Sequence, residues 1–438
     1  MNSPIFQQPI SRRGAISLIG AGAAATLLAG CVGPGSGTAS TVTAATGSAF
    51  TGKASGTVSF YHWRGEDKAT FDTLIDGFQK KNPNIKVNMT ITTSNDYLAN
   101  ALPKVRGGGL GDVLPAFRGA QFGQFADAGI FTDLSGQSVD KEYTPGLIEA
   151  GQSKGKQDGL PYQLLLIYPI FNEDVFDKAS ANPNPSTWDQ TLNSCDKLKS
   201  KGFVPIAYPG ADSGNSSQLL NSMVLADQPS EDAFTKIEAG KLKVTDDWFL
   251  AVLKKYRQLG PYFQPNFIGS SQASARQIFV EQKAGALSTG SYDIATVRQL
   301  GATFPIGMFF PNTLSAAKKD WYQGVYNATF ILGVNAKSKV KPAALKWIEF
   351  LSQKDQAEYY ANQTVQWLTL EGLEYSNPDL KKLAPILKKK LSLDEKFLFL
   401  NKDIANAVYA ACNDSASGVP VDQAAEKAQK IIDQSRSQ

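Results

Sequence analysis

Histidine occurs only once in this chain of 438 residues, at His62. A Ser-His-Asp triad needs a histidine beside its nucleophile, and many zinc sites use several imidazoles. His62 stands between Tyr61 and Trp63 at the expected end of a strand, where packing or hydrogen bonding is its ordinary role. The sequence therefore argues against these classes of catalyst, and we expect neither a metal nor a cofactor.

An excess of one charge sign is also missing. Lysine and arginine number 44 and aspartate and glutamate number 40. Without Arg12 and Arg13, which fall in an expected export signal, 42 basic residues face 40 acidic ones, a formal charge of +2. Such a balance supplies no field that would attract nucleic acid. The short basic cluster at residues 388–390 is interpreted as a solvated helix face.

Long apolar runs are absent except near the start of the chain. Residues 14–28 are apolar or small apart from Ser17 and Thr26, a run shorter than the roughly 20 residues that span a bilayer. The run follows Arg12 and Arg13 and ends in Leu28-Ala29-Gly30-Cys31. This pattern predicts an export signal over residues 1–30, by the twin-arginine or the general secretory route, with a lipid added to Cys31. The alternative is a cleaved signal whose cysteine is incidental.

The segment that follows is rich in glycine, serine, threonine and alanine. Residues 31–55 hold almost no large apolar side chain and are expected to form a flexible tether spanning on the order of 25–30 Å. The predicted location is therefore extracytoplasmic, with the protein anchored by lipid to the outer face of the cell membrane.

Cysteine is scarce in the remaining body, where Cys195 and Cys412 are far apart and show no metal-binding spacing. Outside the cytoplasm the two thiols can form a disulfide. They can equally remain two separate buried thiols, and the sequence leaves both alternatives open.

The body begins with alternating strands and helices. A strand is expected at residues 57–61 and another at 85–91, where Ile85, Val87, Met89 and Ile91 alternate with polar residues. Between them, apolar residues of the segment 68–81 recur at helical spacing. A third strand at 112–117 and a helix at 121–128 follow. This alternation predicts an α/β fold with a mainly parallel sheet, whose ligands bind in the loops after the strands.

Several ordered segments resemble the extracellular solute-binding proteins that supply sugars to ATP-driven (ABC) importers, of the maltose-binding-protein-like class. These segments are residues 78–87, 125–130, 160–162 followed by 168–176, 187–189, 279–293 and 330–342. Leu114-Pro115 in the third strand and Gln366-Trp367-Leu368 depart from the family pattern. The similarity runs from about residue 57 to 370.

The resemblance implies a two-lobe fold of the periplasmic-binding-protein type, with three crossings between the lobes and ligand in the cleft. We expect lobe one to comprise residues 56–162 and 288–337, and lobe two 163–287 and 338–438. The expected crossings lie near residues 162–163, 284–290 and 335–342. The implied partners are a saccharide and the membrane permease subunits of an importer, and the protein is expected to be a monomer.

A sugar ring has two apolar faces, which aromatic rings cover, and hydroxyls that carboxylates, amides and arginine satisfy. On this basis we expect a site built from cleft loops. The candidates are Trp63, Arg64, Glu66, Tyr97, Arg118, Gln121, Tyr162, Gln163, Ser291, Tyr292, Asp293, Trp321, Gly324, Tyr326, Asn327 and Trp367.

Alternative interpretations accompany some of these candidates. Trp63 can instead cover the end of the sheet, and Arg118 can pair with Asp112. The adjacent Tyr359 and Tyr360 resemble ferric ligands of iron-binding relatives, but they fall in an amphipathic helix, and a helix position is the favoured interpretation. Two rival functions also remain, an exported carbohydrate-active hydrolase and a binding protein used in sensing.

Overall fold

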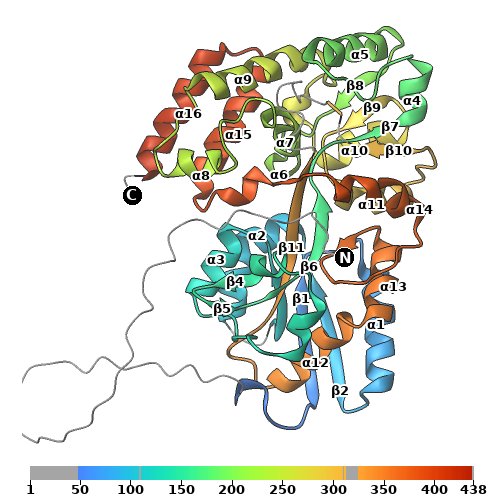
Figure 1. Cartoon of the computed structure of the whole chain (residues 1–438), viewed down its shortest axis with the longest axis vertical. Helices are drawn as coiled ribbons and strands as arrows, with labels where there is room; N and C mark the ends of the chain where they lie inside the picture. Colours follow the sequence, from blue (N-terminus) through green and yellow to red (C-terminus); the bar gives the residue numbers. More distant parts are fainter. Residues whose placement is uncertain (1–47, 108–109, 309, 312–323, 437–438) are drawn as a thin grey trace, which may run out of the picture.

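The computed structural model describes residues 48–107, 110–308, 310–311 and 324–436. Cys31, the export signal, most of the tether and Trp321 lie outside these residues. The described part of the chain folds into two lobes that lie one above the other along the long axis (Figure 1). The two-lobe α/β fold expected from the sequence is confirmed.

Lobe one is built on a mixed sheet. Its strand order is β12-β6-β11-β3-β1-β2, with β13 paired to β11. The strands are β1 (Gly56–His62), β2 (Ile85–Ile91), β3 (Val113–Ala116), β6 (Leu160–Leu166), β11 (Val325–Val334), β12 (Trp367–Leu368) and β13 (Ser392–Leu393). Strand β1 is parallel to β2 and β3, whereas β11 is antiparallel to both β3 and β6. The expectation of a mainly parallel sheet is therefore wrong for the half of the sheet beyond β3.

Helices cover this sheet because each has one apolar face. In α1 (Lys68–Lys81) the buried residues are Phe71, Leu74, Ile75 and Phe78, as the helical spacing predicted. The other helices of lobe one are α2 (Ser94–Arg106), α3 (Ala120–Asp127), α12 (Lys341–Leu351) and α13 (Lys354–Thr364). A short hairpin of β4 (Gln152–Ser153) and β5 (Lys156–Gln157) lies beside them.

Lobe two has a smaller sheet in the order β10-β7-β9-β8. Its strands are β7 (Ile170–Asn172), β8 (Val204–Ala207), β9 (Ala284–Leu287) and β10 (Ile306–Met308). Its helices are α4 (Glu173–Lys178), α5 (Trp188–Ser200), α6 (Ser213–Ser216), α7 (Gln218–Val224), α8 (Ala233–Glu238), α9 (Asp247–Leu259), α10 (Gln272–Val280), α11 (Ile294–Gln299), α14 (Pro378–Leu383), α15 (Lys402–Ala416) and α16 (Val421–Arg436).

The lobe boundaries differ from those expected. Residues 288–308 were assigned to lobe one, but β10 pairs with β7 in the smaller sheet. Residues 338–370 were assigned to lobe two, but α12 and α13 pack against α1 in lobe one, and β12 pairs with β6. Long-range strand pairing, which local sequence does not encode, decides both assignments.

The first crossing follows β6, close to the expected residues 162–163. The expected crossings near 284–290 and 335–342 are wrong, because residues 284–287 form β9 of lobe two, and β11 and α12 both belong to lobe one. The chain instead returns to lobe one between β10 and β11 and passes to lobe two again after β12.

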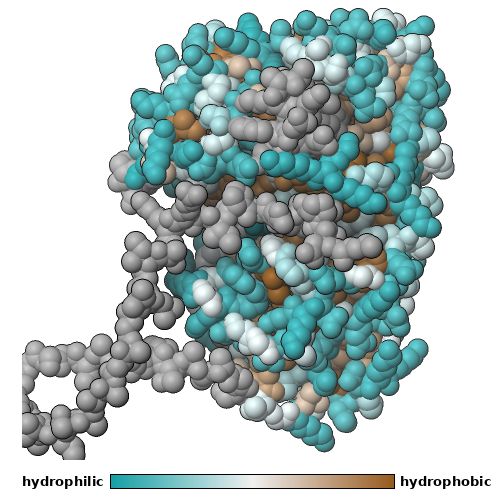
Figure 2. All heavy atoms as spheres, in the orientation of Figure 1, coloured by the Kyte–Doolittle hydropathy of each residue, from teal (hydrophilic) through white to brown (hydrophobic). Residues whose placement is uncertain are grey.

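Most of the visible surface in Figure 2 is hydrophilic, and hydrophobic residues show where the two lobes meet. Strands β6 and β11 lie side by side and run toward this boundary (Figure 1). Among the described residues, no helix combines the length and the apolar character that crossing a membrane requires.

Candidate functional site

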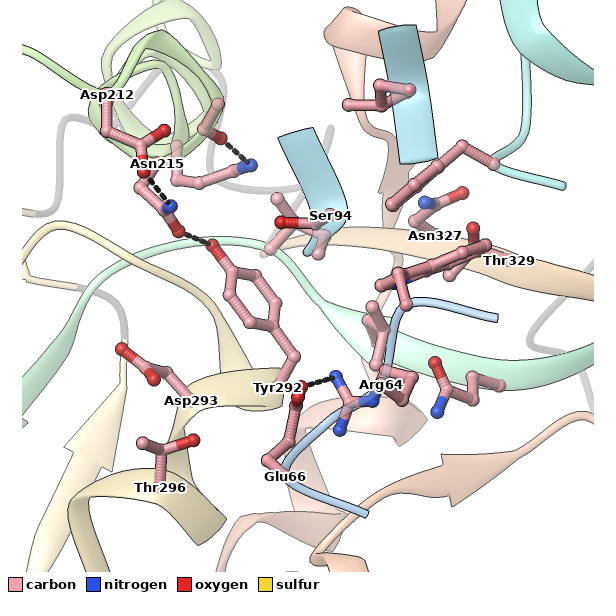
Figure 3. A pocket seen from close by; sticks show the side chains of 18 of the residues that line it. Arg64, Glu66, Ser94, Asp212, Asn215, Tyr292, Asp293, Thr296, Asn327 and Thr329 are labelled. Carbon is pink, nitrogen blue, oxygen red and sulfur yellow. Dashed lines mark hydrogen bonds and ion pairs between the residues drawn. The ribbon is translucent and has the colours of Figure 1, made fainter. Parts of the chain in front are cut away.

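A cavity of about 430 Å³ lies between the lobes (Figure 3). Residues from the sheet of lobe one, from helices of both lobes and from connecting loops form its wall. They are Trp63, Arg64, Glu66, Ser94, Asn95, Leu98, Phe117, Gln163, Leu165, Ile167, Asp212, Gly214, Asn215, Gln218, Arg276, Tyr292, Asp293, Thr296, Asn327, Thr329 and Asp394.

An aromatic wall is formed where two neighbouring strands of lobe one end. Trp63 follows β1 and Phe117 follows β3, and their rings stack with centroids 3.7 Å apart. Tyr97 lies behind Trp63 at 4.9 Å, and its hydroxyl donates to the carbonyl of Pro115. The wall therefore presents an apolar surface that is supported from behind.

Next to this wall, Arg64 is held by two acids. Its Nε and Nη2 donate to the two carboxylate oxygens of Asp67 at 2.8 and 3.0 Å, and Nη1 lies 2.9 Å from Oε1 of Glu66. Burial opposes the charge, but Asp67 and Glu66 raise the pKa of Arg64 well above its ordinary value. Oε2 of Glu66 has no partner among the described residues, while Asp67 is buried and does not line the cavity.

A second network lies behind the floor of the cavity. The Tyr360 hydroxyl, on α13, donates to Oδ2 of Asp67 at 2.5 Å. The same hydroxyl accepts from Nε2 of Gln163, on β6, at 2.6 Å. Through these bonds Tyr360 of α13 and Asp67, the residue that precedes α1, fix the amide of Gln163, which lines the cavity.

The opposite wall belongs to lobe two and carries a third network. Asn215 donates from Nδ2 to Oδ2 of Asp212 at 3.0 Å, and its Oδ1 accepts from the Tyr292 hydroxyl at 2.5 Å (Figure 3). Burial raises the pKa of Tyr292, so the phenol stays neutral. A side chain at Gly290 would put its Cβ 2.6 Å from the Tyr292 ring, so glycine is needed there.

Asp293, which follows Tyr292 in the sequence, has partners for both of its carboxylate oxygens. It accepts from Gln272 and Thr289 and forms an ion pair with Arg276 at 2.8 Å. Facing it, Asn327 and Thr329 on β11 each keep a buried side-chain oxygen without a hydrogen-bond partner among the described residues. These two oxygens border the cavity and are free to meet a ligand.

A second cavity of about 290 Å³ continues from the first. The two share Asn95, Leu98, Phe117 and Gly214. Its other wall residues include Arg118, Gln121, Lys402, Asn406 and Tyr409. The hollow between the lobes is therefore long enough to extend past Phe117 toward α15.

The structure brings together part of the predicted site. Trp63, Arg64, Glu66, Gln163, Tyr292, Asp293 and Asn327 line the first cavity, and Arg118 and Gln121 line the second. Arg118 does not pair with Asp112, which instead accepts from Ser338 and the amide of Ser59. Burial lowers the pKa of Arg118, and the nearby Tyr326 opposes this shift.

The remaining candidates line neither cavity. Tyr97, Tyr162 and Trp367 are buried in the core of lobe one, where Tyr162 donates to the carbonyl of Leu351. Ser291 accepts from the amide of Leu166. Gly324 makes room for Leu391 and Tyr168. Tyr326 lies beside Arg118.

Several wall residues were missed by the sequence reasoning. Asp212 and Asn215 follow the short strand β8, which has too little pattern to be recognised. Thr329 could have been found, because it lies two positions after Asn327 on β11 and so shares its face. For Arg276 and Asp394 we find no sequence signal.

His62, Cys195 and Cys412 are buried and line neither cavity. The His62 ring is fully buried against Phe60, Phe71 and Phe330, and its Nδ1 accepts from the amide of Arg64. Cys195 and Cys412 are both buried and unpaired, so the disulfide alternative is wrong. The described residues contain no group of three or more histidine, cysteine, aspartate or glutamate side chains placed to hold a metal ion.

The chain is similar to proteins of known kind. The family model for bacterial extracellular solute-binding proteins matches residues 73–372. A multiple sugar-binding protein of Streptococcus mutans is 21% identical over 344 residues, covering 75% of this chain and 79% of the relative.

Solved structures show the same fold. A chitin oligosaccharide binding protein superposes with a TM-score of 0.77 at 17% identity, over 87% of this chain and 99% of the other. The solute-binding protein RafE in complex with raffinose gives 0.74 at 18% identity, over 87% and 100%. The solute receptor AcbH, described as preferring β-D-galactopyranose exclusively, gives 0.76 at 18% identity, over 87% and 98%. The chain belongs to the family of bacterial extracellular solute-binding proteins, and it is a binding protein rather than an enzyme.

Proposed function

We propose that this protein captures a mono- or oligosaccharide in the cavity between its lobes. The observation that carries the proposal is the make-up of the cavity wall, where the Trp63–Phe117 stack lies opposite Tyr292 and Asn215. An aromatic surface suits the apolar face of a sugar ring, and carboxylate and amide oxygens suit its hydroxyls. The sugar ligands of the relatives named above support the same ligand class.

The captured sugar would be delivered, unchanged, to the permease subunits of an ATP-driven importer. Closure of the lobes would follow from tighter ligand contacts in the closed state, because a ligand shifts a conformational equilibrium only by its differential affinity. A lipid on Cys31 would hold the protein at the outer face of the membrane, and we propose that it acts there as a monomer.

A thermal-shift panel tests the ligand class. It contains D-galactose, D-glucose, raffinose, stachyose, N,N′-diacetylchitobiose, xylobiose, and non-sugar solutes such as amino acids and polyamines. A sugar at 100 times its Kd stabilises the native state by about 2.7 kcal/mol, which raises the melting temperature measurably. A shift with one sugar and none with the other solutes is expected. A shift only with a non-sugar solute would overturn the proposal.

Two further experiments test the proposed lipid anchor and the proposed role in sugar uptake. Replacement of Cys31 by serine should release the protein from the membrane fraction, while the same substitution at Cys195 should not. Deletion of this protein should abolish uptake of the radiolabelled panel sugar by whole cells. Normal uptake together with loss of a transcriptional response to that sugar would favour a sensing role instead.

A further inference from the structure

Tyr360 does not line the cavity, yet it contacts a residue that does. Its hydroxyl lies between Oδ2 of Asp67, at 2.5 Å, and Nε2 of Gln163, at 2.6 Å. All three side chains are at least 99% buried, and of the three Gln163 alone lines the cavity. This chain of hydrogen bonds joins the N-cap residue of α1 to residues of α13 and β6, so three separate segments of lobe one contribute to it.

The donor and acceptor of each of these hydrogen bonds can be assigned by starting from Asp67. Asp67 is paired with Arg64 through two hydrogen bonds, and an ionised carboxylate can only accept. Tyr360 must therefore give its single proton to Asp67. Burial and the neighbouring Asp67 raise the pKa of Tyr360 well above its ordinary value, so the phenol keeps that proton.

Since its proton is used, the Tyr360 oxygen can only accept from Gln163. The amide of Gln163 must then turn Nε2 toward Tyr360, which leaves Oε1 for the cavity. No described residue bonds to this Oε1. An amide that can turn freely offers a ligand either its NH₂ group as a donor or its oxygen as an acceptor. In the sugar-free protein the bond to Tyr360 already fixes the Gln163 amide with its oxygen as the acceptor.

We propose that Tyr360 is a positioning residue that fixes Gln163 as an acceptor, so that this wall selects a ligand that donates hydrogen bonds. The nature of that ligand rests on the function proposed above, whereas the orientation of Gln163 does not. A sugar hydroxyl donates to such an acceptor, and an anionic oxygen does not.

Lobe two repeats this order of bonds. Asp212 accepts from Asn215, and Asn215 accepts from the Tyr292 hydroxyl, so the phenol oxygen is left as an acceptor. The nearby Thr289 hydroxyl donates to Asp293 instead. The two arginines that line the first cavity each form ion pairs, Arg64 with Asp67 and Glu66, and Arg276 through Nη2 with Asp293. The buried Nε of Arg276 has no partner among the described residues. The part of the first cavity next to Gln163 and Tyr292 is therefore suited to uncharged saccharides and unsuited to the anionic groups of uronates and sugar phosphates, which would meet unpaired acceptors there.

Side-chain amide NMR of the sugar-free protein tests the role of Tyr360 directly. The Gln163 amide protons are assigned by their disappearance in Gln163→Glu. In the unmodified protein we expect a nuclear Overhauser contact between these protons and the Tyr360 ring, and slow exchange with solvent. In Tyr360→Phe, loss of one hydrogen bond should speed this exchange roughly threefold to tenfold.

The matched control is Tyr359→Phe, the same change one position earlier on α13, where the exchange rate should not move. If Tyr360→Phe does not fold, the contact and the exchange rate in the unmodified protein still decide the matter. Exchange as fast as that of exposed glutamines, or equal rates in the two variants, would overturn the proposal. So would tighter binding of D-galacturonate or galactose 6-phosphate than of every uncharged panel sugar. A panel without any binding sugar would refute the proposed function but leave the NMR result standing.

Discussion

Trp63 and Phe117 stack with their ring planes 18° apart, although 54 positions of sequence separate them. The contact follows from strand pairing, since β1 and β3 are parallel neighbours with Phe60 opposite Val113. Each strand ends a few residues later and delivers one ring to the same edge of the sheet. The aromatic wall of the cavity is therefore a consequence of the sheet register.

Phe117 supports Trp63 and borders both cavities. We predict that Phe117→Ala weakens binding of the panel sugar by roughly tenfold, since an aromatic contact contributes about 0.5–1.5 kcal/mol beyond its buried area. Isothermal titration calorimetry measures the change. Phe267→Ala, in lobe two, serves as the control because Phe267 lines neither cavity. Equal affinity in the two variants would contradict this role.

Gln163 offers its Oε1 to the cavity, so Gln163→Met should remove one ligand hydrogen bond and little volume. The expected loss is about 1 kcal/mol, or roughly fivefold in the Kd of the panel sugar. Gln277→Met is the matched control, because Gln277 lies on α10, its side chain donates to Glu281, and it lines neither cavity. Unchanged affinity in Gln163→Met would show that the sugar does not reach this wall.

We predict that the buried His62 side chain makes the free energy of unfolding depend on pH. Burial, and then the charge of Arg64, lower the pKa of His62 to about 3, against an ordinary value of 6.5. Between about pH 3 and pH 6.5 the unfolded chain therefore binds a proton at His62 that the folded chain does not bind. This contribution to stability is present above pH 6.5 and is lost as the pH falls toward 3, at up to about 1.4 kcal/mol per pH unit.

Urea unfolding between pH 7 and pH 4 measures this loss. In His62→Gln the slope of unfolding free energy against pH should be smaller by nearly one proton, even if the variant is less stable throughout. Asp140 and Asp158, whose pKa burial raises to about 6, act in the opposite direction and remain in both proteins. Parallel slopes in the two proteins would rule out a buried neutral His62.

Cys195 and Cys412 should behave as protected thiols. Both are buried, and burial raises the pKa of each, which suppresses the reactive thiolate. Iodoacetamide should leave both unmodified in the native protein and should label both in urea without any reductant, as read by peptide mass spectrometry. Resistance to labelling in urea that reductant relieves would instead reveal a disulfide.

Local pattern was sufficient for much of lobe one. The spacing of Phe71, Leu74, Ile75 and Phe78 determined α1, and alternation determined β2, because each pattern lies within one element. The lobe boundaries could not be predicted in the same way. Strand β11 pairs with both β3 and β6, and the positions of β10, α12 and α13 follow from contacts between distant segments.

The residues of the candidate site could likewise be predicted only in part from the sequence. The loop after β1 was predicted because strand ends in such sheets meet at the ligand. Residue type alone did not reveal which aromatic side chains point inward, and Tyr97, Tyr162 and Trp367 are core residues. Pro115 departs from the family pattern, yet it lies within β3 and pairs with Leu332 of β11.

A crystal structure with the panel sugar that gives the largest thermal shift tests the central claim most directly. We predict an intact sugar in the cavity between the lobes, with a ring face on the Trp63–Phe117 wall and hydroxyls donating to Gln163 and Tyr292. A sugar bound outside this cavity, or one found cleaved, would contradict the account.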